Sequence, residues 1–207
     1  MKKQIQLLSL MSLLALTISC EKQKDNDPVV QLDAVVVENI HAPGDVINRT
    51  TGQVEQENPF RYYSLETNTE VNNADQNWDI GFKGTTIIVN SGVSGPGNAS
   101  AAMMQGTFEE TREVPTGLDF RSDSQSEFAI PTGSGNGWYN YNSSSHIISP
   151  VPGRILLVKT NGGKYAKVEI LSYYKDNPPI SEVNAMTTPG SYYTFQYILQ
   201  PDGSKSF

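Results

Sequence analysis

The sequence predicts an all-β protein made mainly of antiparallel sheets, with at most a short helix. Short runs of β-branched and aromatic residues recur along the chain, and Gly, Pro, Asn and Asp separate them. No segment keeps the 3.6-residue apolar period of an amphipathic helix. The runs that we expect to form strands are residues 29–30, 35–37, 60–65, 78–90, 138–141, 155–160, 165–174 and 192–199.

The first 28 residues differ from this strand-rich region. Two lysines precede an apolar run over residues 5–18, which ends at Ser19-Cys20. This order is typical of a bacterial signal peptide that is cleaved before a cysteine. The run is too short for a membrane-spanning helix, which needs about 20 apolar residues. We therefore expect residues 1–19 to be a lipoprotein signal peptide and Cys20 to be the lipidated N-terminus. Because Thr17 stands where leucine is usual, an ordinary secretory signal is the alternative.

Residues 20–28 are polar and rich in turn-forming residues, which predicts a flexible tether to a single domain over residues 29–207. Loss of Lys2 and Lys3 with the signal peptide leaves 13 of the 15 basic residues against 22 acidic ones, a formal charge of −9. This charge argues against nucleic acid and against an anionic membrane surface as partners, so the lipid is the expected membrane attachment. Cys20 is the only cysteine, so the domain has no thiol for a disulfide, a metal site or a nucleophile.

The clearest local unit is a hairpin formed by residues 155–160 and 165–174. Asn161-Gly162 lies between the two runs and supplies the positive φ angles that a tight turn requires. Polarity alternates along the second run, so one face is expected in the core and the other in water. The residues expected in the core are Ala166, Val168 and Ile170, and those expected in water are Lys167 and Glu169.

The C-terminal run has the same alternation. Its core face is expected to carry Tyr193, Phe195, Tyr197 and Leu199, and Pro201-Asp202-Gly203 is expected to turn the chain. Two Gly-rich stretches, residues 91–97 and 133–137, do not resemble strands. They are either surface loops or a pocket wall that something approaches closely.

An ordered set of motifs resembles a known family. The segment Asn77-Trp78-Asp79-Ile80-Gly81-Phe82 runs on to a Gly-rich stretch over residues 90–99. Four further segments follow in order: Gly137-Trp138-Tyr139, residues 154–158, residues 163–168 and residues 192–197. Together they resemble the HmuY-type haem-binding lipoproteins of Bacteroidetes over roughly residues 58–207. The resemblance implies a mostly β lipoprotein on the outer membrane, facing outward, that captures haem and passes it to an outer-membrane receptor. Glu21, Asp25 and Asp27 resemble the acidic export signal that follows the lipidated cysteine in such proteins.

Haem in such proteins is held by axial histidine or methionine ligands. The best-known member has one ligand histidine near the position of His146, at a different spacing from the tryptophan, and a second on a segment that corresponds here to the shorter stretch 119–137. That stretch contains no His or Met, so the resemblance does not carry over a bis-histidine pair. His146 is the leading ligand candidate, and His41 lies before the matched region and is more typical of a loop or strand-edge residue.

Met103 and Met104 are the nearest substitutes for a second iron ligand. Adjacent residues on a strand face opposite ways, so at most one of them is expected to face a pocket, and both are also typical core residues. The aromatic residues expected to line a haem face, or else to form core and cross-strand pairs, are Trp138, Tyr139 and Tyr141.

The sequence carries no sign of an enzyme. It has no His-Glu-x-x-His, no Gly-x-Ser-x-Gly and no Walker lysine after a Gly-rich loop. The two remaining function classes are a haem-binding protein for haem and iron acquisition and a surface lipoprotein that keeps the β scaffold without haem. The second class acts in adhesion or assembly, or binds another flat or apolar ligand.

Overall fold

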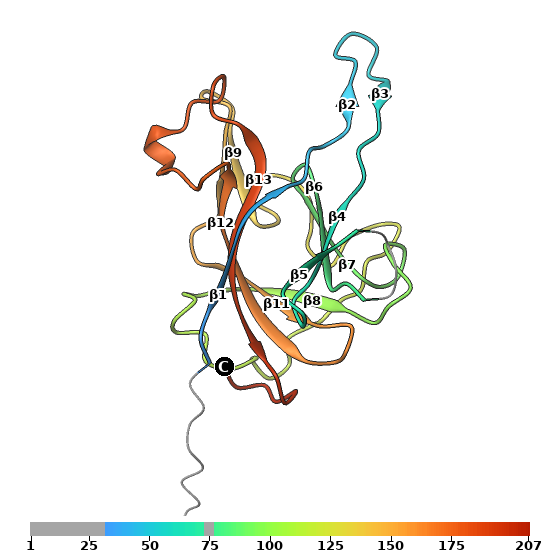
Figure 1. Cartoon of the computed structure of the whole chain (residues 1–207), viewed down its shortest axis with the longest axis vertical. Helices are drawn as coiled ribbons and strands as arrows, with labels where there is room; N and C mark the ends of the chain where they lie inside the picture. Colours follow the sequence, from blue (N-terminus) through green and yellow to red (C-terminus); the bar gives the residue numbers. More distant parts are fainter. Residues whose placement is uncertain (1–31, 73–76) are drawn as a thin grey trace, which may run out of the picture. The chain divides into compact units, whose positions relative to one another are not determined.

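Two antiparallel sheets carry most of the fold (Figure 1). The computed structural model describes residues 32–72 and 77–207. One sheet has five strands in the order β1-β13-β12-β11-β8, and the other has four in the order β5-β4-β6-β7. Two hairpins, β2–β3 and β9–β10, form separate two-stranded sheets. This confirms the all-β, antiparallel fold class. The predicted signal peptide, Cys20, the tether and the strand at 29–30 lie outside the described residues.

The strands are β1 (Val35–His41), β2 (Val46–Ile47), β3 (Val54–Gln56), β4 (Arg61–Ser64), β5 (Thr69–Val71), β6 (Ile80–Lys83), β7 (Thr86–Val89), β8 (Ser100–Gln105), β9 (Tyr139–Asn142), β10 (Ile147–Pro150), β11 (Arg154–Lys159), β12 (Tyr165–Tyr174) and β13 (Gly190–Gln200). One short 3₁₀ turn, η1 (Ile180–Glu182), is the helical element among the described residues. None of the helices in the described residues is long and apolar enough to span a membrane.

The run predicted as one strand over residues 78–90 is two strands. Gly84 has φ +55° and turns the chain between β6 and β7, which then pair with each other. Glycine adopts this left-handed conformation without the steric cost that a Cβ brings. The prediction was wrong because it did not treat Gly84, within the polar stretch 83–86 between two apolar runs, as a turn.

The predicted hairpin of residues 155–160 and 165–174 is confirmed as β11 and β12, with Leu156 opposite Val168. Its turn differs from the prediction. The Gly163 N–H donates to the Thr160 carbonyl (2.9 Å), and the positive φ is +87° at Gly163 rather than at Asn161-Gly162. The turn is therefore longer than two residues, and a glycine in the left-handed region closes it, as in three-residue hairpin loops.

The main core lies between the two sheets. Tyr193, Phe195 and Tyr197 of β13 are fully buried in it, as predicted, and Leu199 packs at its edge. The residues of β12 that were predicted to face inward are also buried there: Ala166, Val168 and Ile170.

The opposite face of the five-stranded sheet is covered too, which corrects the prediction that Lys167 faces water. Lys167 is 3% exposed, and its Nζ donates to the carbonyls of Phe108 and Thr111, both at 2.7 Å. A second core forms on this face around Phe108 and Leu157. Burial lowers the pKa of Lys167. Two carbonyl acceptors make burial of this ammonium group tolerable, because they replace the water that it loses.

Candidate functional site

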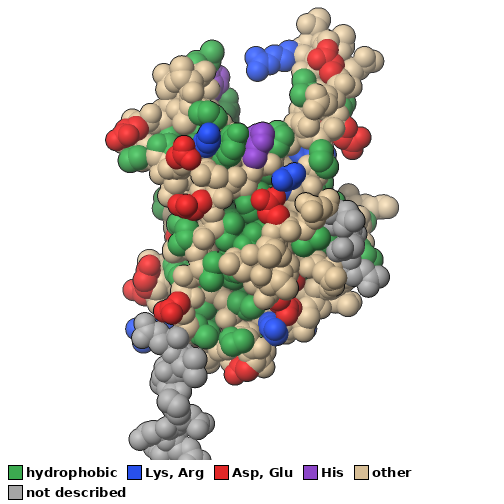
Figure 2. Space-filling view, viewed as in Figure 1, with side chains coloured by type: hydrophobic (Ala, Val, Ile, Leu, Met, Phe, Trp, Pro, Cys, Tyr) green, Lys and Arg blue, Asp and Glu red, His purple; other side chains and the backbone are tan. Residues whose placement is uncertain are grey.

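The β2–β3 and β9–β10 hairpins are both attached to the β6–β7 turn. Asp45, just before β2, forms an ion pair with Lys83 of β6 (3.1 Å). Two residues further on, the Thr85 carbonyl accepts a hydrogen bond from Trp138 Nε1 (2.8 Å), just before β9. The β6–β7 turn therefore fastens the feet of both hairpins. Figure 2 shows the surface hollowed between two projecting parts. We call this space the inter-hairpin hollow.

One wall of the hollow is the β2–β3 hairpin, whose base is firmly held. The Asn58 N–H donates to Asp45 Oδ1 (2.8 Å), and the Asn58 amide donates to the Gly44 carbonyl (2.7 Å). The Asn58 N–H and the Lys83 ammonium together hold the pKa of Asp45 below its usual value. Beyond this base the hairpin bears three exposed aliphatic side chains: Val46, Ile47 and Val54.

The other wall is the β9–β10 hairpin, which carries His146 at its tip. The Asn142 side chain accepts hydrogen bonds from the N–H groups of Ser144 and Ser145 (2.9 and 3.1 Å), which builds the turn. His146 follows with φ +59° and is exposed. Its Nδ1 lies 2.6 Å from the Tyr141 hydroxyl.

This arrangement suits a metal-binding imidazole. Among the described residues, no hydrogen bond engages the other ring nitrogen of His146, Nε2. When Nδ1–H donates to the Tyr141 oxygen, the Nε2 lone pair is available to a metal ion, and the hydroxyl fixes the ring orientation. The pairing with Tyr141 is a feature that the sequence analysis missed. The signal for it was the Asn-Ser-Ser-Ser turn, which brings residues 141 and 146 together across a hairpin.

The three aromatic candidates lie at different depths. Trp138 is buried in the main core, with its ring centroid 5.1 Å from that of Tyr193. Tyr139 is half-buried beside Trp138, and Tyr141 is exposed on β9. Tyr139 and Tyr141 therefore reach the hairpin surface, whereas Trp138 supports it from below.

Met103 and Met104 face opposite sides of β8, as expected from adjacent strand positions. Met103 packs against the main core, and its sulfur accepts a hydrogen bond from Arg154 Nη1 (3.7 Å). Met104 packs in the second core on the other face of the sheet. Among the described residues no hydrogen bond joins either sulfur to the β9–β10 hairpin. Met104 therefore faces away from the main core, on the other side of the sheet from Met103.

His41 ends β1, immediately before the chain enters the β2–β3 hairpin. Its ring stacks on that of Tyr192, its cross-strand partner, with centroids 4.3 Å apart. The side chain is exposed, in line with its interpretation as an edge residue. Within the described residues no group of three or more His, Cys, Asp or Glu side chains is arranged to hold a metal ion.

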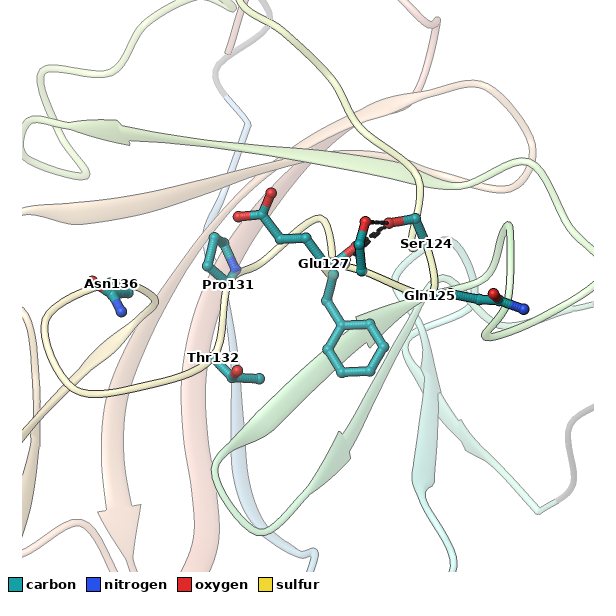
Figure 3. A pocket seen from close by; sticks show the side chains of 8 residues that line it. Ser124, Gln125, Glu127, Pro131, Thr132 and Asn136 are labelled. Carbon is teal, nitrogen blue, oxygen red and sulfur yellow. Dashed lines mark hydrogen bonds between the residues drawn. The ribbon is translucent and has the colours of Figure 1, made fainter.

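Two pockets lie away from the hollow. The first, of 480 Å³, is formed by the stretch that the resemblance marked as shortened, and Figure 3 shows Glu127, Pro131 and Thr132 around it. The Ser124 hydroxyl donates to the Glu127 carbonyl (2.9 Å) at its edge. Its lining residues are Ser124, Gln125, Ser126, Glu127, Phe128, Pro131, Thr132 and Asn136, a mainly polar set without a histidine or methionine.

The second pocket, of 700 Å³, is acidic, and Glu66, Glu70 and Asp79 contribute to it. All three carboxylates have partners in the fold, and Glu70 pairs with Arg61 (3.0 Å). Asp79 is almost fully buried and accepts hydrogen bonds from the N–H groups of Leu65 and Asn161, both at 2.7 Å. Burial raises the pKa of Asp79. Glu66 accepts from the Thr160 hydroxyl (2.6 Å) and pairs with Lys164 (2.9 Å). We call this group the acidic joint, because it fastens the β11–β12 turn to the four-stranded sheet.

Comparison with known proteins identifies the family. The family model of the HmuY protein matches residues 56–197, so β1, β2 and the start of β3 precede the matched region. A search of curated proteins gives no match. Similar solved structures include an apo HmuY analog from Tannerella forsythia, at 14% identity and TM-score 0.46, over 82% of this chain and 97% of that one. Apo PinO from Porphyromonas gingivitis has 17% identity and TM-score 0.48, over 82% and 98%. Since the family model matches more than half of the chain, this protein belongs to the HmuY family.

Proposed function

We propose that this protein is a haem-binding lipoprotein, anchored through Cys20 to the outer membrane and facing outward, which captures haem and delivers it to an outer-membrane receptor. Membership of the HmuY family over residues 56–197 is the observation that carries this proposal. Haem is the cargo of the protein rather than a cofactor for chemistry, and the protein is a binder rather than an enzyme.

In this proposal His146 binds the iron through Nε2 in the inter-hairpin hollow. Tyr141 supports it by accepting the Nδ1 proton, which holds the imidazole in the tautomer that a metal needs. The exposed position of His146 gives haem direct access from solvent. Tyr139 and Tyr141 offer ring surface to the macrocycle beside this ligand.

The second axial ligand is the weaker part of the site. Met103 is the methionine candidate that we retain, because Met104 packs in the second core. For its sulfur to bind iron, Met103 must release the hydrogen bond from Arg154. A thioether prefers ferrous to ferric iron, so a site with one imidazole and one thioether should bind haem more tightly after reduction.

Haem titration of the purified protein tests this proposal. The wild-type protein should give a sharp Soret band that saturates at one haem per chain. His146→Ala should weaken ferric haem binding at least about tenfold, or about 1.4 kcal/mol. Met103→Ala should weaken binding mainly under reducing conditions, and Met104→Ala is the matched control that should change neither. His41→Ala controls for loss of a surface imidazole.

A broad spectrum like that of free haem in the wild-type protein would reject the haem proposal. The scaffold would then serve adhesion, assembly or another flat ligand. Acid should weaken binding in the wild type, because a proton competes with iron for Nε2. The anchor is tested separately: Cys20→Ala should move the protein from the detergent phase to the aqueous phase of a detergent extraction. Protease added to intact cells should cleave the wild type if it faces outward.

A further inference from the structure

We propose that Asn161 is a site of spontaneous deamidation, in which the Gly162 nitrogen attacks the side-chain amide of Asn161 and Glu66 takes the proton from that nitrogen. The product carries an aspartate or an isoaspartate at position 161, inside the acidic joint. The reaction requires water but no haem, so it goes beyond the proposed function.

The first observation is that Asn161-Gly162 does not serve as the left-handed pair of a two-residue turn. Within residues 160–164, the positive φ lies at Gly163. A glycine is required at position 162 for a different reason, because a Cβ there would clash with Glu66 Oε1. The turn therefore places a carboxylate directly against the peptide nitrogen that follows an asparagine.

The Asn-Gly sequence supplies the two groups that react. The Gly162 nitrogen forms a bond with Asn161 Cγ, which closes a succinimide ring, and the bond from Cγ to Nδ2 breaks. Nδ2 leaves as ammonia with the proton that the backbone nitrogen has lost. Water then opens the ring at either carbonyl, which gives aspartate or isoaspartate. Glycine hinders this ring closure least, because it has no side chain.

Glu66 is placed to act as the base. The Gly162 N–H donates to Glu66 Oε1 (3.0 Å). An amide nitrogen is a poor nucleophile until its proton is removed, so a carboxylate that already accepts this hydrogen favours the attack. The Thr160 hydroxyl (2.6 Å) and Lys164 (2.9 Å) hold the carboxylate in place. They also lower the pKa of Glu66, so the carboxylate is ionised at neutral pH.

A backbone donor is placed at the oxygen where charge develops. Asn161 Oδ1 accepts a hydrogen bond from the Asn98 N–H (2.9 Å). Attack on Cγ makes this oxygen negative, and a donor already directed at it stabilises the charge. The Asn161 N–H donates to Asp79 Oδ1 (2.7 Å), which fixes the backbone of the asparagine. Base, nucleophile and donor therefore converge on one asparagine.

The chain contains a second Asn-Gly pair, Asn136-Gly137, which lacks this arrangement. Gly137 is buried, and its N–H donates to the Gly133 carbonyl (3.4 Å). A peptide carbonyl is too weak a base to take an amide proton. A Cβ at position 137 would clash with the Pro131 carbonyl, so the segment is also closely packed. Asn136 is therefore an internal control with the same dipeptide sequence.

Deamidation adds a negative charge to the acidic joint. The new carboxylate belongs to a residue whose own N–H is bound by Asp79 and whose neighbour's N–H is bound by Glu66. Like charges in a partly buried site disfavour one another. Isoaspartate also lengthens the backbone of the turn by one carbon. The modified joint should therefore hold the β11–β12 turn less firmly against the four-stranded sheet.

The reaction is tested by incubating the full-length protein at neutral pH for several weeks, followed by peptide mapping with mass spectrometry and enzymatic labelling of isoaspartate. In the folded protein, Asn161 should be modified at least about tenfold faster than Asn136. The two rates should converge in urea, where only the shared sequence remains. Glu66→Gln should reduce the rate at Asn161 to that at Asn136, because an amide does not take the proton. Glu70→Gln, in the same pocket, is the matched control and should leave both rates unchanged.

Two results would overturn the proposal. One is a rate at Asn161 in the folded protein that does not exceed the rate at Asn136. The other is an equal or faster rate at Asn161 in Glu66→Gln, which would mean that the carboxylate protects the asparagine. The structural consequence is measured separately with Asn161→Asp, which should lower the urea midpoint, whereas Asn136→Asp should not. An unchanged midpoint in Asn161→Asp would show that the joint tolerates the added charge.

Discussion

The acidic joint and the inter-hairpin hollow place polar side chains in opposite situations. In the joint, Asp79 and Glu66 are directed at backbone N–H, hydroxyl and ammonium groups that satisfy them. At the tip of the β9–β10 hairpin, by contrast, the Nε2 atom of His146 has no hydrogen bond among the described residues. Polar groups that already have hydrogen-bond partners stabilise the fold, whereas a polar group without one is available to bind a ligand.

The acidic joint shows that one motif of the family resemblance stabilises the fold rather than binding a ligand. Asp79 belongs to the Asn77-Trp78-Asp79 motif, and its two oxygens bind the backbone of Leu65 and of Asn161. It therefore fastens the four-stranded sheet to the β11–β12 turn of the five-stranded sheet. Trp78 beside it is fully buried. This motif identifies the fold, so it can be present whether or not the chain binds haem.

The largest expected effect is that of Asp79→Ala on stability. The substitution leaves two backbone N–H groups without their charged acceptor, which should lower the free energy of unfolding by about 3 kcal/mol. Urea denaturation measures this change. Haem affinity of the folded fraction should stay at the wild-type value. Loss of haem binding with unchanged stability would break the comparison, because it would place Asp79 in the ligand site.

Lys167→Met should have the next largest effect and extends the comparison to a third buried charge. It removes the donor from the carbonyls of Phe108 and Thr111, which should destabilise the protein by about 2 kcal/mol. Because burial lowers the pKa of Lys167, its protonated form is penalised in the folded state. The stability of the wild type relative to this variant should therefore increase as the pH rises through the folded-state pKa toward the unfolded one.

Lys159→Met, at the half-buried end of β11, is the control for the Lys167 variant. It should change the urea midpoint little at any pH. If Lys167→Met lowers the urea midpoint as little as Lys159→Met does, the hydrogen bonds from Lys167 to the Phe108 and Thr111 carbonyls do not stabilise the fold. Apolar packing in the second core would then be what attaches this segment to the sheet.

Side-chain alternation predicted the main core well, because Ala166, Val168 and Ile170 follow a period of two against one buried face. It misplaced Lys167, because the segment around Phe108 that covers this lysine has no periodic pattern. The sequence of β12 does not show that another segment packs on its outer face. A lone polar residue on the outer face of a strand does not reveal whether another layer packs there.

The candidate site was predictable only in part. His146 stands out from sequence because a chain with two histidines offers few iron ligands. Its contact with Tyr141 depends on the turn of the β9–β10 hairpin, which the sequence analysis did not predict. The β2–β3 hairpin was not predicted either, because strands of two and three residues are too short to show an alternating pattern.

The smallest expected effect is that of Glu66→Gln, and its sign with pH sharpens the comparison inside the joint. Burial opposes ionisation of Glu66, but the Thr160 hydroxyl and Lys164 outweigh it and lower the pKa. The charged form is thus favoured by folding, and Glu66→Gln should cost about 1 kcal/mol at neutral pH. This difference is present above the unfolded-state pKa and should be lost as the pH falls through the folded-state pKa.

The pH dependence of the Asp79 contribution has the opposite sign, because burial raises the pKa of Asp79 and folding favours its protonated form. The deficit of Asp79→Asn should therefore widen over the same acid range. Urea unfolding of both variants from neutral to acid pH measures the two trends, and two deficits that shrink together would show that the carboxylates do not differ in the way their burial and partners require.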